Sequence, residues 1–216
     1  KEHKIKFTEK IFFTKVNRPS GFVFWFHVAS IGELNSIVSL VNYYLKKDNK
    51  YNFLITTVTL SSFNQFSKQF GNNPRVFHQF LPYDLNFFSN NFLKVWKPNL
   101  VSFVDSEIWP NFIFAIKKEN IPLVLLNARI TKKTFGRWSL LKRFTEKIFG
   151  LFSLCISSSE ETTYYLNLLK AKKIKYFGNL KFCAKIQKVQ SSTFNPLNKL
   201  NDKKIWCAVS THNNEE

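Results

Sequence analysis

The sequence predicts an α/β fold, in which a parallel β-sheet is wound in two directions and covered by helices on both faces. Short apolar runs recur along the 216-residue chain without strict polar–apolar alternation, a pattern typical of strands buried on both faces. Segments with helical spacing separate several of these runs. Hydrophobic residues make up 44% of the chain, which is enough for a sizeable core. Strand and helix in alternation favour the doubly wound, Rossmann-like architecture.

Each predicted strand is an apolar run bounded by polar or turn-forming residues. Runs of this length with such boundaries are typical of strands in a buried sheet. In chain order, the predicted strands are residues 21–28, 51–58, 75–81, 99–104, 122–128, 151–158, 174–180 and 204–210.

Two predicted helices have the clearest signals. In residues 34–47 apolar side chains recur every three or four positions, and Lys46 and Lys47 suit the negative end of the helix dipole. A shorter helix is predicted after Trp109, with Pro110 at its first position. Both segments lie between predicted strands, as the fold requires.

A change in composition marks the end of the first predicted domain. From about residue 186 the chain becomes polar, before the apolar run at 204–210. We predict one domain in residues 1–195, followed in residues 196–216 by a linker and the first strand of a second, truncated domain. The chain contains no Met and stops with no closing element after the predicted strand 204–210, so we expect a fragment cut at both ends.

The net charge of +18 has two interpretations. A basic surface attracts nucleic acids and anionic lipid head groups, so a basic nucleic-acid-binding domain is an alternative function. Few of the basic residues are Arg, however, and the chain is also rich in Asn, Phe and Ile, which an AT-rich coding genome produces without selection for binding. No RNP, zinc-finger or helix-turn-helix signature accompanies the charge.

The three cysteines are scattered along the chain and show no CxxC spacing. We therefore predict no metal site, and the free thiols suggest a reducing compartment. No apolar run approaches the 18 or so residues that a membrane-spanning helix needs. The chain also begins without a signal-peptide pattern.

Side chains with hydroxyl, carboxylate, amide or basic groups follow the predicted strands. In an open parallel sheet, ligands bind beyond the carboxyl ends of the strands, where loops enter helices and backbone N–H groups point outward. We therefore expect binding or catalytic residues in these loops. The loop residues of interest are His27, Ser30, Gly32, Glu33, Thr56, Thr57, Asp105, Glu107, Asn127, Arg129, Asn179, Lys181, Ser210, Thr211 and His212.

Each of these residues also has a structural interpretation when it is considered alone. Glu33 stands at the start of a predicted helix, where the helix dipole stabilises a carboxylate and keeps it ionised, as a general base requires. Asp105 and Glu107 flank the start of another predicted helix, so N-terminal capping is an alternative role. His27 is compatible with a satisfied core histidine, and Arg129 with a surface ion pair.

The motifs at the strand ends occur in a characteristic order. They are HVASIGE, ITTVTLSS, LPYDL, SEIWPN, LLNARI, SSSEE, GNLKF and STHNNEE. In this order and at these separations, they resemble the bacterial 3-deoxy-D-manno-octulosonic acid (Kdo) transferase family of lipopolysaccharide biosynthesis. The resemblance runs from about Arg18 to the last residue.

The resemblance implies an inverting glycosyltransferase with two Rossmann-like halves facing across a cleft, the GT-B arrangement. The N-terminal half, residues 1–195, would receive the acceptor, and the missing C-terminal half would hold the donor CMP-Kdo, so the fragment alone is expected to be inactive. Glu33 would be the catalytic base that takes a proton from a glucosamine hydroxyl of the lipid A precursor. Glu107 would be a second catalytic carboxylate. Neither a cofactor beyond the donor substrate nor a metal is implied.

The resemblance also implies substrate contacts and a location. The residues expected to contact substrates are Ser30, Gly32, Thr56, Thr57, Asp105, Arg129, Asn179, Lys181, Ser210, Thr211 and His212, the last five near the phosphate or carboxylate of CMP-Kdo. Enzymes of this kind associate with the cytoplasmic face of the bacterial inner membrane. The basic, aromatic segment 132–144 is our candidate for a membrane-facing patch, and an ordinary helix with a solvated basic face is the alternative.

Overall fold

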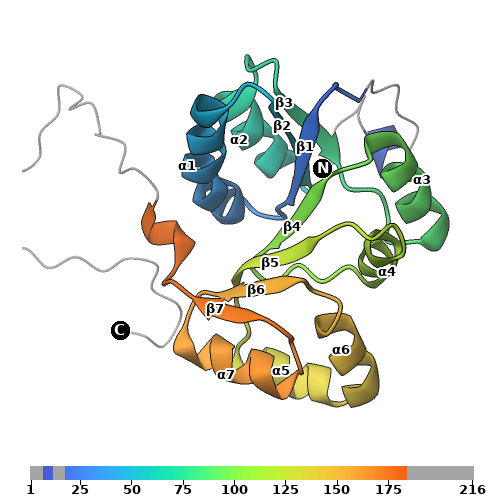
Figure 1. Cartoon of the computed structure of the whole chain (residues 1–216), viewed down its shortest axis with the longest axis vertical. Coiled ribbons are helices and arrows are strands. Elements are labelled where there is room, and N and C mark those ends of the chain that lie inside the picture. Colours follow the sequence, from blue (N-terminus) through green and yellow to red (C-terminus); the bar gives the residue numbers. More distant parts are fainter. Residues whose placement is uncertain (1–6, 12–17, 184–216) are drawn as a thin grey trace, which may run out of the picture. The chain divides into compact units, whose positions relative to one another are not determined.

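A computed structural model describes residues 7–11 and 18–183, and in these residues strands alternate with helices around one sheet (Figure 1). The strand order is β3-β2-β1-β4-β5-β6-β7, and every neighbouring pair is parallel. The prediction of a doubly wound parallel sheet is confirmed. The strands are β1 (Phe22–His27), β2 (Tyr51–Thr57), β3 (Val76–Phe80), β4 (Leu100–Val104), β5 (Leu123–Ala128), β6 (Leu154–Ser157) and β7 (Ile174–Tyr176).

Two predicted strands are shorter in the structure than in the prediction. The run 151–158 becomes a strand only from Leu154. The run 174–180 ends as a strand at Tyr176, and a 3-10 helix, η2 (Leu180–Cys183), follows after a turn at Gly178 with φ of 88°. The predicted strand 204–210 and the predicted domain boundary at residue 195 lie outside the described residues and stay predictions.

Helices cover the sheet from opposite sides because the winding reverses between β1 and β4 (Figure 1). Side chains of α1 and α2 pack against one face of the sheet, and side chains from the helices after β3 pack against the other. The helices are α1 (Ile31–Lys47), α2 (Leu60–Phe70), α3 (Asn86–Trp96), α4 (Pro110–Lys118), α5 (Lys132–Ser139), α6 (Lys142–Phe149) and α7 (Glu160–Leu168), and a 3-10 helix, η1 (Phe7–Ile11), lies against β3.

The core consists of two clusters, one on each face of the sheet, because successive side chains of a strand point to opposite faces. On the α3–α4 face, the fully buried Trp25 ring packs against Phe92, Phe103 and Phe112 with ring centroids 4.7–5.7 Å apart. Burial of each large apolar side chain contributes about 1.5–3 kcal/mol to stability. This packing gives the loops at the strand ends a rigid base.

Most helices start at a hydroxyl side chain that accepts a hydrogen bond from the backbone N–H three positions later, which satisfies one of the free donors of the first turn. Ser30, Thr59 and Ser159 serve α1, α2 and α7 in this way. Helix α4 differs, because its N-cap residue, Trp109, makes no side-chain capping bond. Its free N–H groups are satisfied instead by Asp84, from the loop between β3 and α3.

A largely apolar groove of about 460 Å³ lies on the α1 face of the sheet. Its floor is formed by β1, β2, β4, β5 and β6, and Leu40 and Tyr44 of α1 line one side. The segment from Phe177 to Leu180 and Cys183 complete the lining. The groove therefore exposes part of the sheet surface that helices α1 and α2 leave uncovered.

Candidate functional site

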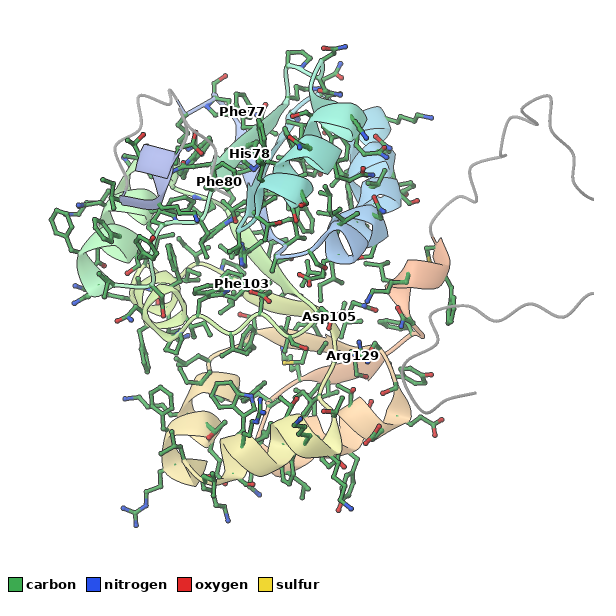
Figure 2. All side chains as sticks on the ribbon, turned by 180° about the vertical axis from the view of Figure 1, so that it is seen from behind. Phe77, His78, Phe80, Phe103, Asp105 and Arg129 are labelled. Carbon is green, nitrogen blue, oxygen red and sulfur yellow. The ribbon has the colours of Figure 1, made fainter. Side chains whose placement is uncertain are left out.

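The backbone at the ends of β4 and β5 is unusual. Asp105 has φ of 63° and Asn127 has φ of 53°, both in the left-handed region that few residues other than glycine adopt. The Asp105 N–H donates to the Leu126 carbonyl at 2.9 Å, and the Arg129 N–H donates to the Asp105 carbonyl at 3.3 Å. These bonds hold the two strand ends together, so Asp105 and Arg129 lie close to each other (Figure 2). Such strained residues are concentrated at functional sites.

Glu33 is fixed at the start of α1 by three short hydrogen bonds. The Ala29 N–H donates to Glu33 Oε2 at 2.8 Å, and the Ser30 hydroxyl donates to Oε1 at 2.8 Å. The Ser30 oxygen in turn accepts the Glu33 N–H at 3.2 Å. This reciprocal pattern is a form of capping box. The Ser62 hydroxyl of α2 donates to the Ala29 carbonyl at 2.9 Å and so ties the same turn to the next helix.

The surroundings of Glu33 favour its protonated form. Burial raises the pKa of this carboxyl group, and the bonds from Ala29 and Ser30 oppose that effect. Repulsion from Glu107 and Asp105 raises the pKa further, and the net result lies above the usual value of 4.5. The side chain is only partly buried and accessible to ligands. A carboxylate with a raised pKa is a better proton acceptor near neutral pH than an ordinary glutamate.

Glu107 differs from Glu33, because the pKa of its carboxyl group is lowered rather than raised. Its Oε2 atom accepts the Trp109 indole N–H at 2.9 Å and lies 3.3 Å from His27 Nε2. Burial alone would raise the pKa of Glu107, but the hydrogen bonds from His27 and Trp109 outweigh burial and lower the pKa. The carboxylate is therefore ionised at neutral pH, and about 20% of its side chain is exposed.

Asp105 forms an ion pair with the chain segment that follows β7. Lys181 Nζ lies 3.1 Å from Asp105 Oδ2, and about 40% of the lysine side chain stays exposed. Two asparagines hold this segment, since Asn127 Oδ1 accepts the Leu180 N–H at 2.8 Å and Asn179 Oδ1 accepts the Lys181 N–H at 3.0 Å. This arrangement places the positively charged side chain of Lys181 at the carboxyl edge of the sheet, where Asp105 lies.

The structure places the predicted residues in three groups. Ser30, Gly32, Glu33, Asp105, Glu107, Arg129, Asn179 and Lys181 lie in loops or first helical turns at the carboxyl edge of the sheet. Thr56 and Thr57 are fully buried, and their hydroxyls lie 2.9 Å from ring nitrogens of His27 and His78 respectively. Ser210, Thr211 and His212 are outside the described residues. The substrate contacts of all of these residues stay predictions.

The capping alternatives for the carboxylates have different outcomes. Glu33 lies in the first turn of α1, as the helix-dipole interpretation requires, and its bonds to Ala29 and Ser30 also make it part of the cap. Neither Asp105 nor Glu107 bonds to the first turn of α4, because Asp84 occupies that place. The capping role of Asp84 was not predicted, since nothing in the local pattern reveals a cap supplied from another loop. Trp109 lies two residues after Glu107 in the sequence, but residue spacing does not predict the hydrogen bond from its indole N–H to the Glu107 carboxylate.

Other chemistry is limited within the described residues. Burial raises the pKa of the Cys155 thiol to about 12, so this cysteine is not a nucleophile at neutral pH. No group of three or more His, Cys, Asp or Glu side chains in residues 7–11 and 18–183 is arranged to hold a metal ion. In the same part of the chain, none of the helices has the length and apolar character needed to cross a bilayer.

Comparisons with known proteins agree on one family. The family model described as 3-Deoxy-D-manno-octulosonic-acid transferase (kdotransferase) matches residues 5–184. The 3-deoxy-D-manno-octulosonic acid transferase of Rickettsia bellii is 33% identical over 218 residues, which is 100% of this chain and 51% of that protein. The protein of the same name from Haemophilus influenzae is 29% identical over 194 residues, covering 88% of this chain and 45% of that protein.

Solved structures with the same fold have different sequences. The UDP-GlcNAc 2-epimerase from Neisseria meningitidis, bound to UDP-GlcNAc, superposes with a TM-score of 0.53 at 15% identity, over 76% of this chain and 48% of that chain. This likeness supports the fold alone, a Rossmann-like half of the GT-B type. The chain spans about half the length of the relatives that it matches.

Proposed function

The chain belongs to the 3-deoxy-D-manno-octulosonic-acid (Kdo) transferase family, and we propose that the complete protein transfers Kdo from CMP-Kdo to a glucosamine hydroxyl of the lipid A precursor in lipopolysaccharide biosynthesis. The observation that carries this proposal is the geometry of Glu33. It is a partly buried carboxylate with a raised pKa, held at a helix N-terminus on the carboxyl edge of a parallel sheet.

The proposed reaction is a single displacement with inversion. Glu33 accepts the proton of the acceptor hydroxyl while the hydroxyl oxygen forms a bond to the anomeric carbon of Kdo. The bond between that carbon and the phosphate oxygen breaks, and CMP leaves with the bonding electrons. Because Ser30 and Ala29 fix the carboxylate, the base is already oriented when the acceptor arrives.

The remaining residues of the edge are proposed to bind and stabilise the substrates. Glu107, held ionised by His27 and Trp109, orients the acceptor or stabilises positive charge that develops on Kdo. Lys181 and Arg129 carry exposed positive charge suited to the phosphate of CMP-Kdo or the carboxylate of Kdo. Asn179 helps to hold Lys181 through its backbone.

We also propose association with the cytoplasmic face of the inner membrane, through the turn between α5 and α6. Phe135 stacks on Tyr165 and Trp138 packs against Phe149, so the aromatic rings of segment 132–144 face partly inward. Leu140 and Leu141 are instead 84% and 62% exposed. Exposed leucines between basic helices suit an anionic membrane surface that also contains the acceptor.

The comparisons give no support to the nucleic-acid alternative.

The test is Glu33→Gln in the full-length protein. Glutamine also forms a capping box, so the fold of the turn is kept while the proton acceptor is lost. We expect transfer to fall by about 10²–10⁴-fold, the usual contribution of a general base, with CMP-Kdo binding unchanged. The products are measured by mass analysis of lipid A from a host that lacks its own Kdo transferase.

The matched control is Ser30→Ala, which removes the N-cap hydroxyl and keeps the base. It is expected to lower stability by about 0.5–2 kcal/mol and to reduce transfer much less than Glu33→Gln. Wild-type transfer by Glu33→Gln would refute the role of Glu33 as the base.

A further inference from the structure

A chain of hydrogen bonds runs behind Glu107 into the core. His27, at the end of β1, is fully buried, and its Nδ1 atom lies 2.9 Å from the Thr56 hydroxyl of β2. The same hydroxyl accepts the indole N–H of Trp25 at 2.8 Å. On the other side of the ring, Nε2 lies 3.3 Å from Glu107 Oε2. The imidazole therefore connects a buried hydroxyl to a carboxylate at the edge of the sheet.

The partners of Thr56 favour one arrangement of the hydrogens. The Thr56 oxygen accepts the indole hydrogen of Trp25 with one of its two lone pairs, and its own hydrogen is available to donate. Its other acceptor, the Phe26 carbonyl, is 3.5 Å away, outside the normal range for such bonds, whereas His27 Nδ1 is at 2.9 Å. A hydroxyl that donates to Nδ1 leaves the ring neutral, with its hydrogen on Nε2 facing Glu107.

We propose that His27 is a positioning residue for Glu107: a neutral imidazole, fixed as the Nε2–H tautomer by Thr56, that donates a hydrogen bond to the carboxylate and sets its orientation. The proposal rests on the proposed function, because it concerns how Glu107 serves transfer. Trp25 supports it indirectly, by occupying one of the two acceptor positions of the Thr56 hydroxyl.

The position of Glu107 agrees with this role. Its two donors, His27 and Trp109, both reach Oε2, and Oε1 receives no hydrogen bond from the described residues. One oxygen thus anchors the side chain, and the other is left for a ligand. The titratable groups that interact with this carboxylate are His27 from β1, through the hydrogen bond, and Glu33 from α1, through charge repulsion. Without the donor on His27, only the bond from Trp109 would oppose burial, so the pKa of Glu107 would be higher.

The first test reads the tautomer directly in the full-length wild-type protein. Histidine labelled with ¹⁵N distinguishes a protonated from an unprotonated ring nitrogen in NMR correlation spectra, and the His27→Gln variant identifies the signals of His27. At neutral pH we expect a protonated Nε2 and an unprotonated Nδ1. A doubly protonated ring, or a hydrogen on Nδ1 alone, overturns the proposal. This measurement does not depend on activity or on the folding of a kinetic variant.

The second test compares three substitutions in the full-length protein. The amide nitrogen of glutamine lies close to the position of Nε2, so His27→Gln keeps the donor to Glu107. In His27→Asn the amide reaches only towards Thr56, and His27→Phe removes both bonds. For these last two variants we expect kcat to fall by about 10²-fold, the effect of a misplaced catalytic group, with KM changed little. His27→Gln is expected to recover most of this loss.

A titration of Glu107 itself separates positioning from a purely structural role. In His27→Asn the pKa of the Glu107 carboxyl group, followed by ¹³C NMR, is expected above its wild-type value, because the carboxylate loses a hydrogen-bond donor. The matched control is His78→Asn on β3, which leaves this pKa unchanged. A folded His27→Asn variant with wild-type kcat and an unchanged pKa of Glu107 overturns the proposal. Failure of the proposed function looks different, since wild-type protein would then show no Kdo transfer while the tautomer signal remained.

Discussion

At the scale of single residues, Glu33 combines two requirements in one side chain. Its oxygens close the first turn of α1, and the same bonds fix the direction in which a proton is accepted. Capping bonds alone would lower the pKa of this carboxyl, yet burial and the charges of Glu107 and Asp105 raise it. The site therefore keeps the geometry of a cap and the basicity of a catalytic group.

The raised pKa of Glu33 predicts a specific pH dependence. A base must be ionised, so kcat/KM of the full-length protein should fall on acidification through a range above the ordinary glutamate value of 4.5. Asp105→Asn removes one of the charges that raise the pKa of Glu33, so the acid limb should move to lower pH. Asparagine tolerates the left-handed backbone at this position, where φ is 63°.

The control for this shift is Glu119→Gln, which removes a carboxylate from the exposed C-terminal end of α4. It should leave the acid limb unchanged. A limb that stays in place in Asp105→Asn, or moves to higher pH, would show that Asp105 does not act on Glu33 in this way.

The candidate site was only partly predictable from the sequence, and particular residues show why. Glu33, Asp105 and Glu107 are identifiable because they follow apolar runs, and parallel strands end at one edge. The burial of Thr56 and Thr57 could not be predicted, since both belong to β2 itself and their hydroxyls are satisfied by side chains distant in sequence. The bond between His27 and Glu107 joins residues 80 positions apart, and no local spacing encodes it.

At the scale of elements, the start of α4 determines where Glu107 lies. The helix begins three residues after Glu107, and its first N–H groups are held by a side chain from another loop, Asp84. Proline at the first position sets the backbone but supplies no donor or acceptor for the turn. The loop from Asp105 to Trp109 therefore depends on Asp84 for its position.

We predict that Asp84→Ala lowers the free energy of unfolding by about 0.5–2 kcal/mol, the usual cost of losing a helix cap. Transfer by the full-length protein should fall as well, because Glu107 and Trp109 precede the loosened turn. Urea unfolding followed by tryptophan fluorescence measures the first effect. Asn90→Ala removes an exposed bond within α3 and is the control. Equal stability of the two variants would contradict the capping role.

The turn between α5 and α6 predicts how the protein meets a membrane. The double variant Leu140→Ser/Leu141→Ser should bind vesicles of phosphatidylglycerol and phosphatidylethanolamine at least about tenfold more weakly, because each buried leucine contributes about 1.5–3 kcal/mol. Sedimentation with the vesicles measures binding. Tyr43→Ser, on the other face of the sheet and 59% exposed, is the control. Unchanged binding by the double variant would exclude this turn as the contact.

Elements were more predictable than the site. The strands from β1 to β5 fall within a residue or two of their apolar runs, because a strand buried on both faces has a continuous hydrophobic signature. Residues 177–183 were harder to predict. Tyr176 ends β7, and the apolar Leu180 then starts a short 3-10 helix whose position depends on Asn127, a contact over 53 residues.

At the scale of the whole molecule, the apolar groove on the α1 face is a property that no single element reveals. Its floor is made of side chains from β1, β2, β4, β5 and β6, and its walls are α1 and the segment from Phe177 to Cys183. Exposed apolar surface of this kind marks a place that binds hydrophobic molecules. We predict that a fluorescent hydrophobic dye, anilinonaphthalene sulfonate, binds there in the native 216-residue chain.

The variant Leu154→Asp places a charge in the groove and should abolish the native-state fluorescence of the dye. Leu168→Asp introduces the same charge on α7, where the leucine is already 42% exposed, and should leave the fluorescence unchanged. Circular dichroism confirms that both variants are folded. Dye fluorescence that survives in Leu154→Asp would place the binding elsewhere.

The position of β1 in the middle of the sheet has a consequence for biosynthesis. On the ribosome, β1 emerges first and pairs with β2, but its other neighbour, β4, is made only after β2, β3 and three helices. Until then the nascent chain exposes one open edge of β1, and such edges readily join those of other chains. The nascent chain is therefore open to edge-to-edge association on this side of β1 until β4 has been made.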